Sequence, residues 1–324
     1  MCGRPFWRPG NDMDSILSLI ERIDGTHLKE HLFYLAKDPL PCRTLNCTLP
    51  GHEMPTLYEA DDYIARRLGS WGYPVEREPV AVQAYRCDET KDIHHQYSPP
   101  DSSDPWYTAH NLYAKKIGKK HPDEIIIVIS HKDSQSWNTA VPGAHDNAVG
   151  TVGTMEIAQV LADYPSLRSL WFVFCNEEHT PWTSEVTARN LAASDKRVVA
   201  VFNLDSIDGK SDEQVRSGAK FGVTRYVTPE GERLADLMAD LNERHGIGLV
   251  QNKVRGPFPN DDDGSFVKAG IPPAVLVVGS FPYADPHYHL ATDIPENVDI
   301  VNARMAVQLA LATVLHVDGN GSPR

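Results

Sequence analysis

The stretch EIIIVISHKD, residues 124–133, joins an apolar run to a group of polar residues. Residues 124–130 are almost uniformly apolar and lack the alternation of a half-buried strand, which predicts a strand covered on both faces. Three further runs have the same character: 170–175, 198–204 and 273–278. Segments that read as helices separate these runs, and this alternation predicts an α/β fold with a largely parallel sheet.

The intervening segments have apolar residues at helical spacing. Four of them alternate with the strands: 148–164, 184–193, 229–245 and 300–317. Upstream, helical spacing recurs between Pro55 and Pro74, and residues 14–35 predict one or two short helices. The expected architecture is a three-layer α/β sandwich, in which a central, mostly parallel mixed sheet is flanked by helices.

Polar residues follow the first three apolar runs at the point where each run ends. They are His131, Lys132, Asp133, Asn176, Glu177, Glu178 and Asp205. Ligands of doubly wound sheets bind outside the carboxyl ends of the strands, so we expect these side chains to converge on one site. Carboxylates and imidazoles together indicate a metal ion, and both suit Zn²⁺.

Five residues are the candidate metal ligands: His131, Asp146, Glu178, Asp205 and His289. A catalytic zinc keeps a position open for water, so two or three protein ligands per ion are expected. Asp146 lies in PGAHDNAVG (142–150), a glycine-bounded loop that opens a helix. It is therefore placed to bridge two neighbouring cations, which would otherwise repel each other.

The adjacent Glu177 and Glu178 are expected to have different tasks, because two neighbouring carboxylates at a metal repel unless one handles protons. Glu178 is then the metal ligand and Glu177 the general base. Asp133, two residues after His131, is expected to accept a hydrogen bond from that imidazole and so fix its tautomer. His287 competes with His289, because alternation in an extended segment places both on one side.

Six segments resemble zinc exopeptidase family M28 in order and spacing, across residues 55–317. They are HKDS (131–134), PGAHDNAVG (142–150), FCNEE (174–178), NLD (203–205), DDDGSFVKAGIP (261–272) and YHLATDIPENVD (288–299). The resemblance implies an aminopeptidase-like α/β fold with a co-catalytic site for two zinc ions. One zinc would bind His131 and Asp205 and the other Glu178 and His289, with Asp146 between them and Glu177 as base.

The resemblance extends to further residues. Tyr288 resembles a tyrosine that donates to the oxyanion in some members, and the spacing to Asp293 selects His289 over His287. Our hypothesis for the acidic run 261–263 is that it binds a substrate amine. The chain departs from the family at His145, at HTPW (179–182) and at Ser206, three places that we expect on the rim, where they bear on the substrate more than on the chemistry.

The expected function is that of a metallo-exopeptidase, above all an aminopeptidase, acting on a peptide or small amide. A carboxypeptidase of the same family would need a cationic clamp, and Lys253 and Arg255 are the cations near a motif. The chain also resembles glutaminyl cyclases, acyltransferases with a single zinc, around an Asp-Asp motif and at Phe281-Pro282. A glutaminyl cyclase-like acyltransferase is therefore an alternative function. A non-catalytic binding protein would have lost ligands, and all five are present.

The domain prediction is a helical extension at residues 1–40, packed on a single zinc-exopeptidase-like catalytic domain at 41–324. Between 83 and 110 the chain turns polar, as in SPPDSSDP (98–105), which predicts a long surface excursion with His94 and His95 in solvent.

Composition excludes several classes of function. The 324 residues are 41% hydrophobic and 23% charged, as in ordinary globular proteins. The formal charge of −13 disfavours nucleic acid and anionic membranes as partners, and no apolar run approaches the roughly 20 residues of a membrane span. Without an apolar secretory segment at the N-terminus, the expected location is cytoplasmic. The five cysteines lack CxxC spacing, which argues against a cysteine zinc site. The oligomeric state is left open.

Overall fold

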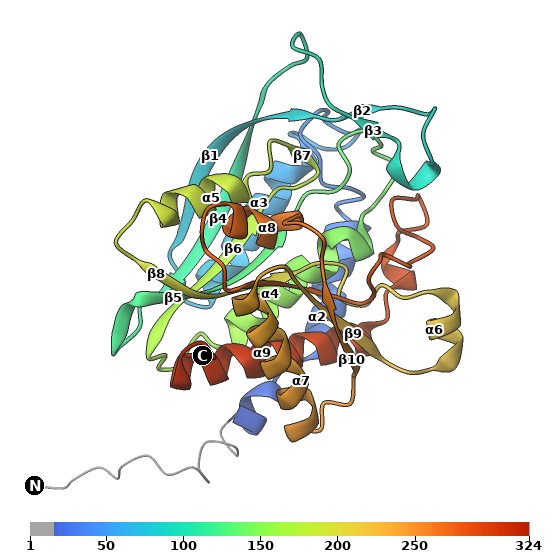
Figure 1. Cartoon of the computed structure of the whole chain (residues 1–324). Coiled ribbons are helices and arrows are strands. Elements are labelled where there is room, and N and C mark those ends of the chain that lie inside the picture. The colour runs from blue at the N-terminus through green and yellow to red at the C-terminus, as the bar shows by residue number, and fades with distance from the viewer. Residues whose placement is uncertain (1–15, 324) are drawn as a thin grey trace, which may run out of the picture.

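A nine-stranded mixed sheet forms the centre of the protein (Figure 1). The structure is a computed structural model, which describes residues 16–323. The strand order is β10-β9-β11-β8-β5-β6-β4-β1-β7. The strands of this sheet are β1 (Val75–Ala84), β4 (Tyr107–Lys116), β5 (His121–His131), β6 (Arg168–Cys175), β7 (His179–Thr180), β8 (Arg197–Leu204), β9 (Phe221–Tyr226), β10 (Val250–Arg255) and β11 (Ala274–Val278).

The four predicted apolar strands are β5, β6, β8 and β11, and they are neighbours in the middle of the sheet. Their mutual pairings are parallel, whereas β4 pairs antiparallel with both β1 and β6, and β9 pairs antiparallel with β11. The predicted α/β sandwich with a mixed sheet is therefore confirmed, with the parallel pairing concentrated where the apolar runs lie.

Helices cover both faces of this sheet (Figure 1). The covering helices are α2 (Gly25–Ala36), α3 (Thr56–Ser70), α4 (Val149–Val160), α5 (Ser184–Ala192), α7 (Pro229–Arg244), α8 (Asp261–Lys268) and α9 (Ile300–Asn320). The short helix α6 (Asp212–Ser217) has no buried residue. Short 3-10 helices lie at η1 (Ile93–His95) and η3 (Pro295–Asn297).

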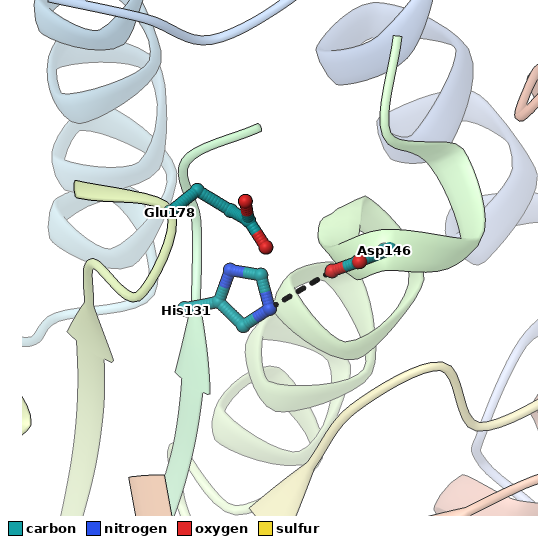
Figure 2. A group of neighbouring side chains, drawn as sticks. All are labelled: His131, Asp146 and Glu178. Atoms are coloured by element: carbon teal, nitrogen blue, oxygen red, sulfur yellow. Dashed lines mark ion pairs between the residues drawn. The ribbon is translucent and has the colours of Figure 1, made fainter. Parts of the chain in front are cut away.

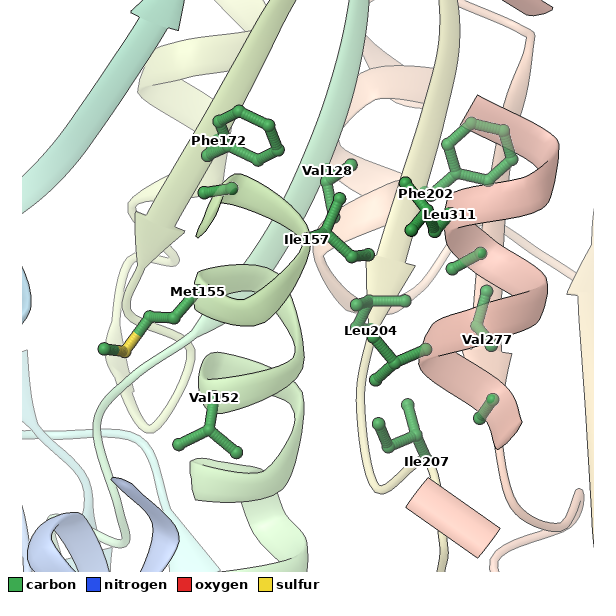
Figure 3. Close-up of a cluster of buried hydrophobic side chains, with 14 of the residues drawn as sticks. Val128, Val152, Met155, Ile157, Phe172, Phe202, Leu204, Ile207, Val277 and Leu311 are labelled. Atoms are coloured by element: carbon green, nitrogen blue, oxygen red, sulfur yellow. The ribbon is translucent and has the colours of Figure 1, made fainter. Parts of the chain in front are cut away.

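Alternation along β5 divides the core into two layers. Ile126 and Val128 pack in one hydrophobic cluster, together with residues of α2, α3, α4, α7 and α9. Ile127 and Ile129 point to the other face and pack in a second cluster, with residues of α5 and α8. Figure 3 shows the first cluster, where Phe172 and Phe202 of the strands meet residues of α4 and α9. Burial on both faces explains why residues 125–129 of β5 and 170–175 of β6 are apolar without interruption.

The last helix, α9, is long and apolar enough to cross a membrane by length and composition alone. It is the one such helix in the described part of the chain, and 67% of its apolar window is buried inside the protein. Leu309, Leu311 and Val314 belong to the same cluster as Phe202. In this structure α9 is accordingly a core helix of the sandwich.

The predicted N-terminal extension lies partly outside the described residues, at 1–15. Within it, α2 contributes Leu28, Leu32 and Leu35 to the main core cluster. The division of the chain at residue 40 stays a prediction.

The surface excursion predicted for residues 83–110 is partly wrong. β1 extends to Ala84 and β4 begins at Tyr107, so both ends of this stretch belong to the sheet. Ala109 is fully buried and packs with Val80 and Val82. Only the middle leaves the sheet, where β2 (Arg86–Cys87) pairs with β3 (Tyr97–Ser98).

Candidate metal centre

The five predicted ligands lie at the carboxyl edge of the central strands. His131 ends β5, Asp205 directly follows β8, and Glu178 lies three residues beyond β6. Asp146 lies in the π-helical turn η2 (Ala144–Ala148), and His289 lies between β11 and α9. Because β8, β5 and β6 are adjacent and parallel, their carboxyl ends meet at one place. Figure 2 shows His131, Asp146 and Glu178 pointing toward one another.

The carboxylate of Asp146 lies between two histidines. Its Oδ1 is 3.1 Å from His131 Nε2, and its Oδ2 is 3.1 Å from His289 Nε2. On the outer sides, Asp205 Oδ1 lies 3.6 Å from His131 Nε2 and Glu178 Oε1 lies 3.6 Å from His289 Nε2. All five residues are buried. The donor atoms thus form two groups that share Asp146.

This donor set fits a metal ion. The donor atoms of His131, Asp146 and Glu178 all lie within 4.8 Å of one another. His289 Nε2 is buried without a well-oriented hydrogen bond in the described part of the chain. Asp146, Glu178 and Asp205 are buried, and within residues 16–323 their ion-pair partners are histidines alone. The two histidines do not neutralise the negative charge of three carboxylates. Nitrogen and oxygen donors of this kind are those that zinc prefers.

The carboxylates also change the pKa of the histidines. Burial alone would lower the pKa of His289, but the carboxylates of Asp146 and Glu178, 3.1 and 3.6 Å from its Nε2, raise the pKa to about 10. Burial would also lower the pKa of His131, but Asp133, Asp146 and Asp205 raise this pKa well above its usual value. A histidine binds a metal only as the neutral ring, so an ion here takes the place of these protons.

Glu177 lies beside this cluster with a buried Oε2 that has no hydrogen-bond partner among residues 16–323. Burial, followed by the negative charges of Asp262 and Asp261, raises the pKa of Glu177 well above its usual value. Its backbone N–H donates to Asp133 Oδ1 over 2.9 Å, which fixes the turn. A carboxyl group in such surroundings is suited to accepting a proton and releasing it again.

Asp133 contacts three groups around the site. Its carboxylate accepts from the Glu177 N–H, lies 3.3 Å from His131 Nδ1 and lies 2.8 Å from His179 Nδ1. The contact with His131 is the one that the sequence predicts. The link to His179 is new, and its only sequence signal is the position of His179 directly after the glutamate pair.

Replacing Asp133 with asparagine is expected to lower zinc affinity by roughly 10- to 100-fold, because the His131 ring loses the acceptor that orients it. Competition with a chromophoric chelator measures this affinity. Asp318→Asn is the matched control, because Asp318 is also fully buried and accepts backbone N–H groups of residues 167 and 168. Equal zinc affinity in Asp133→Asn and the unmodified protein would contradict the assigned role.

The loop after β11 brings His289, and not His287, to the other ligands. His287 stacks on His145 at 5.9 Å and lies 3.0 Å from Thr292 Oγ1. The Tyr288 ring stacks on the His289 ring, with 3.8 Å between centroids.

The expectation that His94 faces solvent is wrong, whereas His95 is exposed. The His94 carbonyl oxygen lies 2.6 Å from His289 Nδ1, and His94 Nδ1 lies 2.8 Å from the Tyr288 carbonyl oxygen. Because the His94 carbonyl oxygen accepts a hydrogen bond from Nδ1, the tautomer of His289 is fixed and its Nε2 faces the cluster. These contacts span 195 and 194 residues of sequence, so no local pattern could have found them.

All three departures from the family pattern include a buried residue, namely His145, His179 and Ser206, which corrects the expectation that they lie on the rim. Ser206 donates to Asp205 Oδ1 over 3.2 Å. His145 lies 3.1 Å from Asp208 Oδ1 and 3.3 Å from Asp285 Oδ2. Both residues therefore contact the segments that carry the ligands.

The acidic run 261–263 is buried at the beginning of α8. Arg225 pairs with Asp261 at 2.7 Å, and the Cys175 thiol donates to Asp262 over 2.9 Å. Both Asp263 oxygens are buried without a hydrogen bond in the described residues, and burial, then the charge of Asp261, raises the pKa of Asp263 to about 8. The run thus forms the buried first turn of α8, after Asn260 at the N-cap position.

A metal-binding α/β protein is the class that this fold and donor set define. Residues 111–314 match the model of Peptidase family M28, which is more than half of the chain. The chain belongs to peptidase family M28, and the resemblance predicted from its motifs is confirmed.

Individual relatives agree with this assignment. Aminopeptidase YwaD of Bacillus subtilis (strain 168) is 30% identical over 216 residues, covering 64% of this chain and 44% of that protein. The chain therefore spans less than half the length of that relative. Among solved structures, an aminopeptidase from Aneurinibacillus sp. strain AM-1 superposes with a TM-score of 0.70 at 18% identity, covering 95% of this chain and 97% of the other. A glutaminyl cyclase from Bacteroides thetaiotaomicron gives 0.67 at 14% identity, covering 90% and 98%. At these identities the two structures establish the shared fold.

Proposed function

We propose that this protein is a zinc-dependent aminopeptidase that hydrolyses the first peptide bond of a peptide or small amide. The observation that carries the proposal is the Asp146 carboxylate, whose two oxygens each lie 3.1 Å from a different histidine. In the proposed site, His131 and Asp205 hold one zinc ion and Glu178 and His289 hold the second. Bound zinc supplies Lewis acidity to a carbonyl group and lowers the pKa of water.

The protein's own groups would then handle the protons. Glu177 takes a proton from the attacking water and returns it to the amine that leaves when the C–N bond breaks. Its raised pKa makes the Glu177 carboxylate a stronger acceptor for the proton of the water. Asp133 holds the Glu177 N–H and the His131 ring, so base and ligand keep a constant separation. Tyr288, stacked on His289, is the proposed donor to the carbonyl oxygen.

The charge around the site supports a substrate with a free amino terminus. Asp262 and Asp263 have buried oxygens without hydrogen-bond partners among residues 16–323, and an ammonium group would supply donors to such oxygens. A carboxypeptidase would need a free cation for the substrate carboxylate. Of the two cations near a motif, Lys253 already pairs with Asp236 and Glu232, and Arg255 is exposed at the last residue of β10.

Metal analysis combined with a substrate panel tests the proposal. We expect about two zinc ions per chain and hydrolysis of aminoacyl-p-nitroanilides, lost with a chelator and restored by zinc. Blocking the substrate amine by acetylation should abolish hydrolysis. One zinc ion, no hydrolysis and release of ammonia from peptides with N-terminal glutamine would instead establish a glutaminyl cyclase-like acyltransferase.

A further inference from the structure

Arg43 is a fully buried cation outside the segment that matches the family model. It lies between α2 and α3, with a relative exposure of 0%, and is with Arg225 one of the two largest fully buried side chains among residues 16–323. In the described part of the chain its guanidinium bonds to backbone carbonyl oxygens and forms no ion pair. Burying a guanidinium group costs desolvation free energy. A fully buried arginine therefore indicates that the fixed arrangement of its donors has a specific role.

The guanidinium joins three segments that are distant in sequence. Nε donates to the Lys132 carbonyl over 2.6 Å, and Nη2 donates to the Gly143 carbonyl over 2.7 Å. Nη1 donates to the carbonyls of Leu35 and Pro142 over 2.6 and 2.8 Å. The first segment is the end of β5, the second is the loop before η2, and the third is the last turn of α2.

Two of these segments carry candidate metal ligands. Lys132 lies between His131 and Asp133, and Gly143 lies three residues before Asp146. Arg43 therefore ties the backbone beside His131 to the backbone beside Asp146, whose donor atoms are 3.1 Å apart. A displacement of about 1 Å between such segments is enough to impair a site whose groups must keep their geometry.

The surroundings of Arg43 are built for this contact. Gly143 has φ +64°, and a Cβ there would lie 3.1 Å from Arg43 Nη2 and 2.4 Å from the Asp146 carbonyl oxygen. Only glycine admits both this conformation and this approach. The Arg43 backbone adds a pair of bonds to Ser134, where its N–H donates to Oγ over 2.8 Å and its carbonyl accepts from the Ser134 N–H.

We propose that Arg43 is a positioning residue of the metal centre, which fixes the segments of His131 and Asp146 relative to each other. This inference rests on the proposed function. It makes zinc binding depend on a residue 88 positions before the first ligand, and it makes the end of α2 part of the support of the site.

The test is Arg43→Lys, because lysine keeps the charge but has one nitrogen that cannot bridge three segments. We expect zinc affinity to fall at least about 10-fold, as when a metal ligand loses its orienting partner. The visible absorption spectrum of the cobalt-substituted protein should shift, since it reports the arrangement of the ligands. Thermal unfolding of the metal-free protein measures the general loss of stability separately.

Arg168→Lys is the matched control for loss of a buried arginine. Arg168 is 8% exposed, pairs with Glu124 and bonds to the Asp318 carbonyl at the beginning of β6, the end of the strand opposite to the metal centre. We expect this variant to lower the unfolding temperature while zinc affinity and the cobalt spectrum stay unchanged.

The inference fails if Arg43→Lys binds zinc as tightly as the unmodified protein with the same cobalt spectrum, and the proposed function would survive that result. If Arg43→Lys does not fold, Ser134→Ala decides, because it removes only the Oγ acceptor of the Arg43 N–H. A several-fold lower zinc affinity in Ser134→Ala supports the inference, and unchanged affinity overturns it. Absence of zinc binding by the unmodified protein would overturn both proposals.

Discussion

Replacing Glu177 with glutamine is expected to lower kcat for amide hydrolysis by about 10²- to 10⁴-fold while zinc content stays the same. Glutamine keeps the size of the side chain and the backbone bond to Asp133, but it cannot accept the proton of the attacking water. The measurement is kcat on an aminoacyl-p-nitroanilide at matched zinc content. KM should change little, because the base acts in the transition state.

Glu156→Gln provides the control for that experiment. Glu156 is also buried, at 1% exposure, and accepts the Asp24 N–H far from the metal centre. It should keep normal kcat. Full hydrolytic activity in Glu177→Gln would show that another group carries the proton.

Replacing Asp146 with alanine is expected to have the largest effect on metal binding. Both histidines lose their nearest carboxylate oxygen, and the two donor groups lose the residue that they share. Loss of an orienting partner alone costs 10- to 100-fold in affinity, so loss of a shared ligand should exceed about 100-fold. Hydrolysis should fall to background.

Zinc stoichiometry by atomic absorption after dialysis measures the effect. Asp318→Ala is the control, since Asp318 is fully buried and joins α9 to the beginning of β6. If Asp146→Ala kept two zinc ions and normal activity, the bridging role of Asp146 would be excluded.

The central part of the fold could be predicted because the strands β5, β6, β8 and β11 are buried on both faces. Such strands are apolar without interruption, and the signal lies within each short segment. β1 and β4 were not predicted, because burial is uneven along both strands. Within 83–110 the polar composition therefore concealed the two ends that join the sheet.

The candidate ligands could be located for a related reason. His131 and Asp205 stand where apolar runs stop, and a parallel sheet brings these ends together. Glu178 follows the same rule after β6. The tasks assigned to these residues, and to Glu177, Asp133 and Tyr288, stay predictions that the experiments above test.

The sequence by itself determined the α/β class, the order of the central strands and helices along the chain, and the motifs of peptidase family M28, since these depend on local periodicity and on residues at strand ends. Only the tertiary structure decided that His94 holds His289, that His179 holds Asp133 and that Arg43 joins the loops of His131 and Asp146. Each of these is a hydrogen bond between segments far apart in sequence, made in two of the three cases by a backbone carbonyl oxygen. Every residue has such a group, so its partner depends only on how the chain folds.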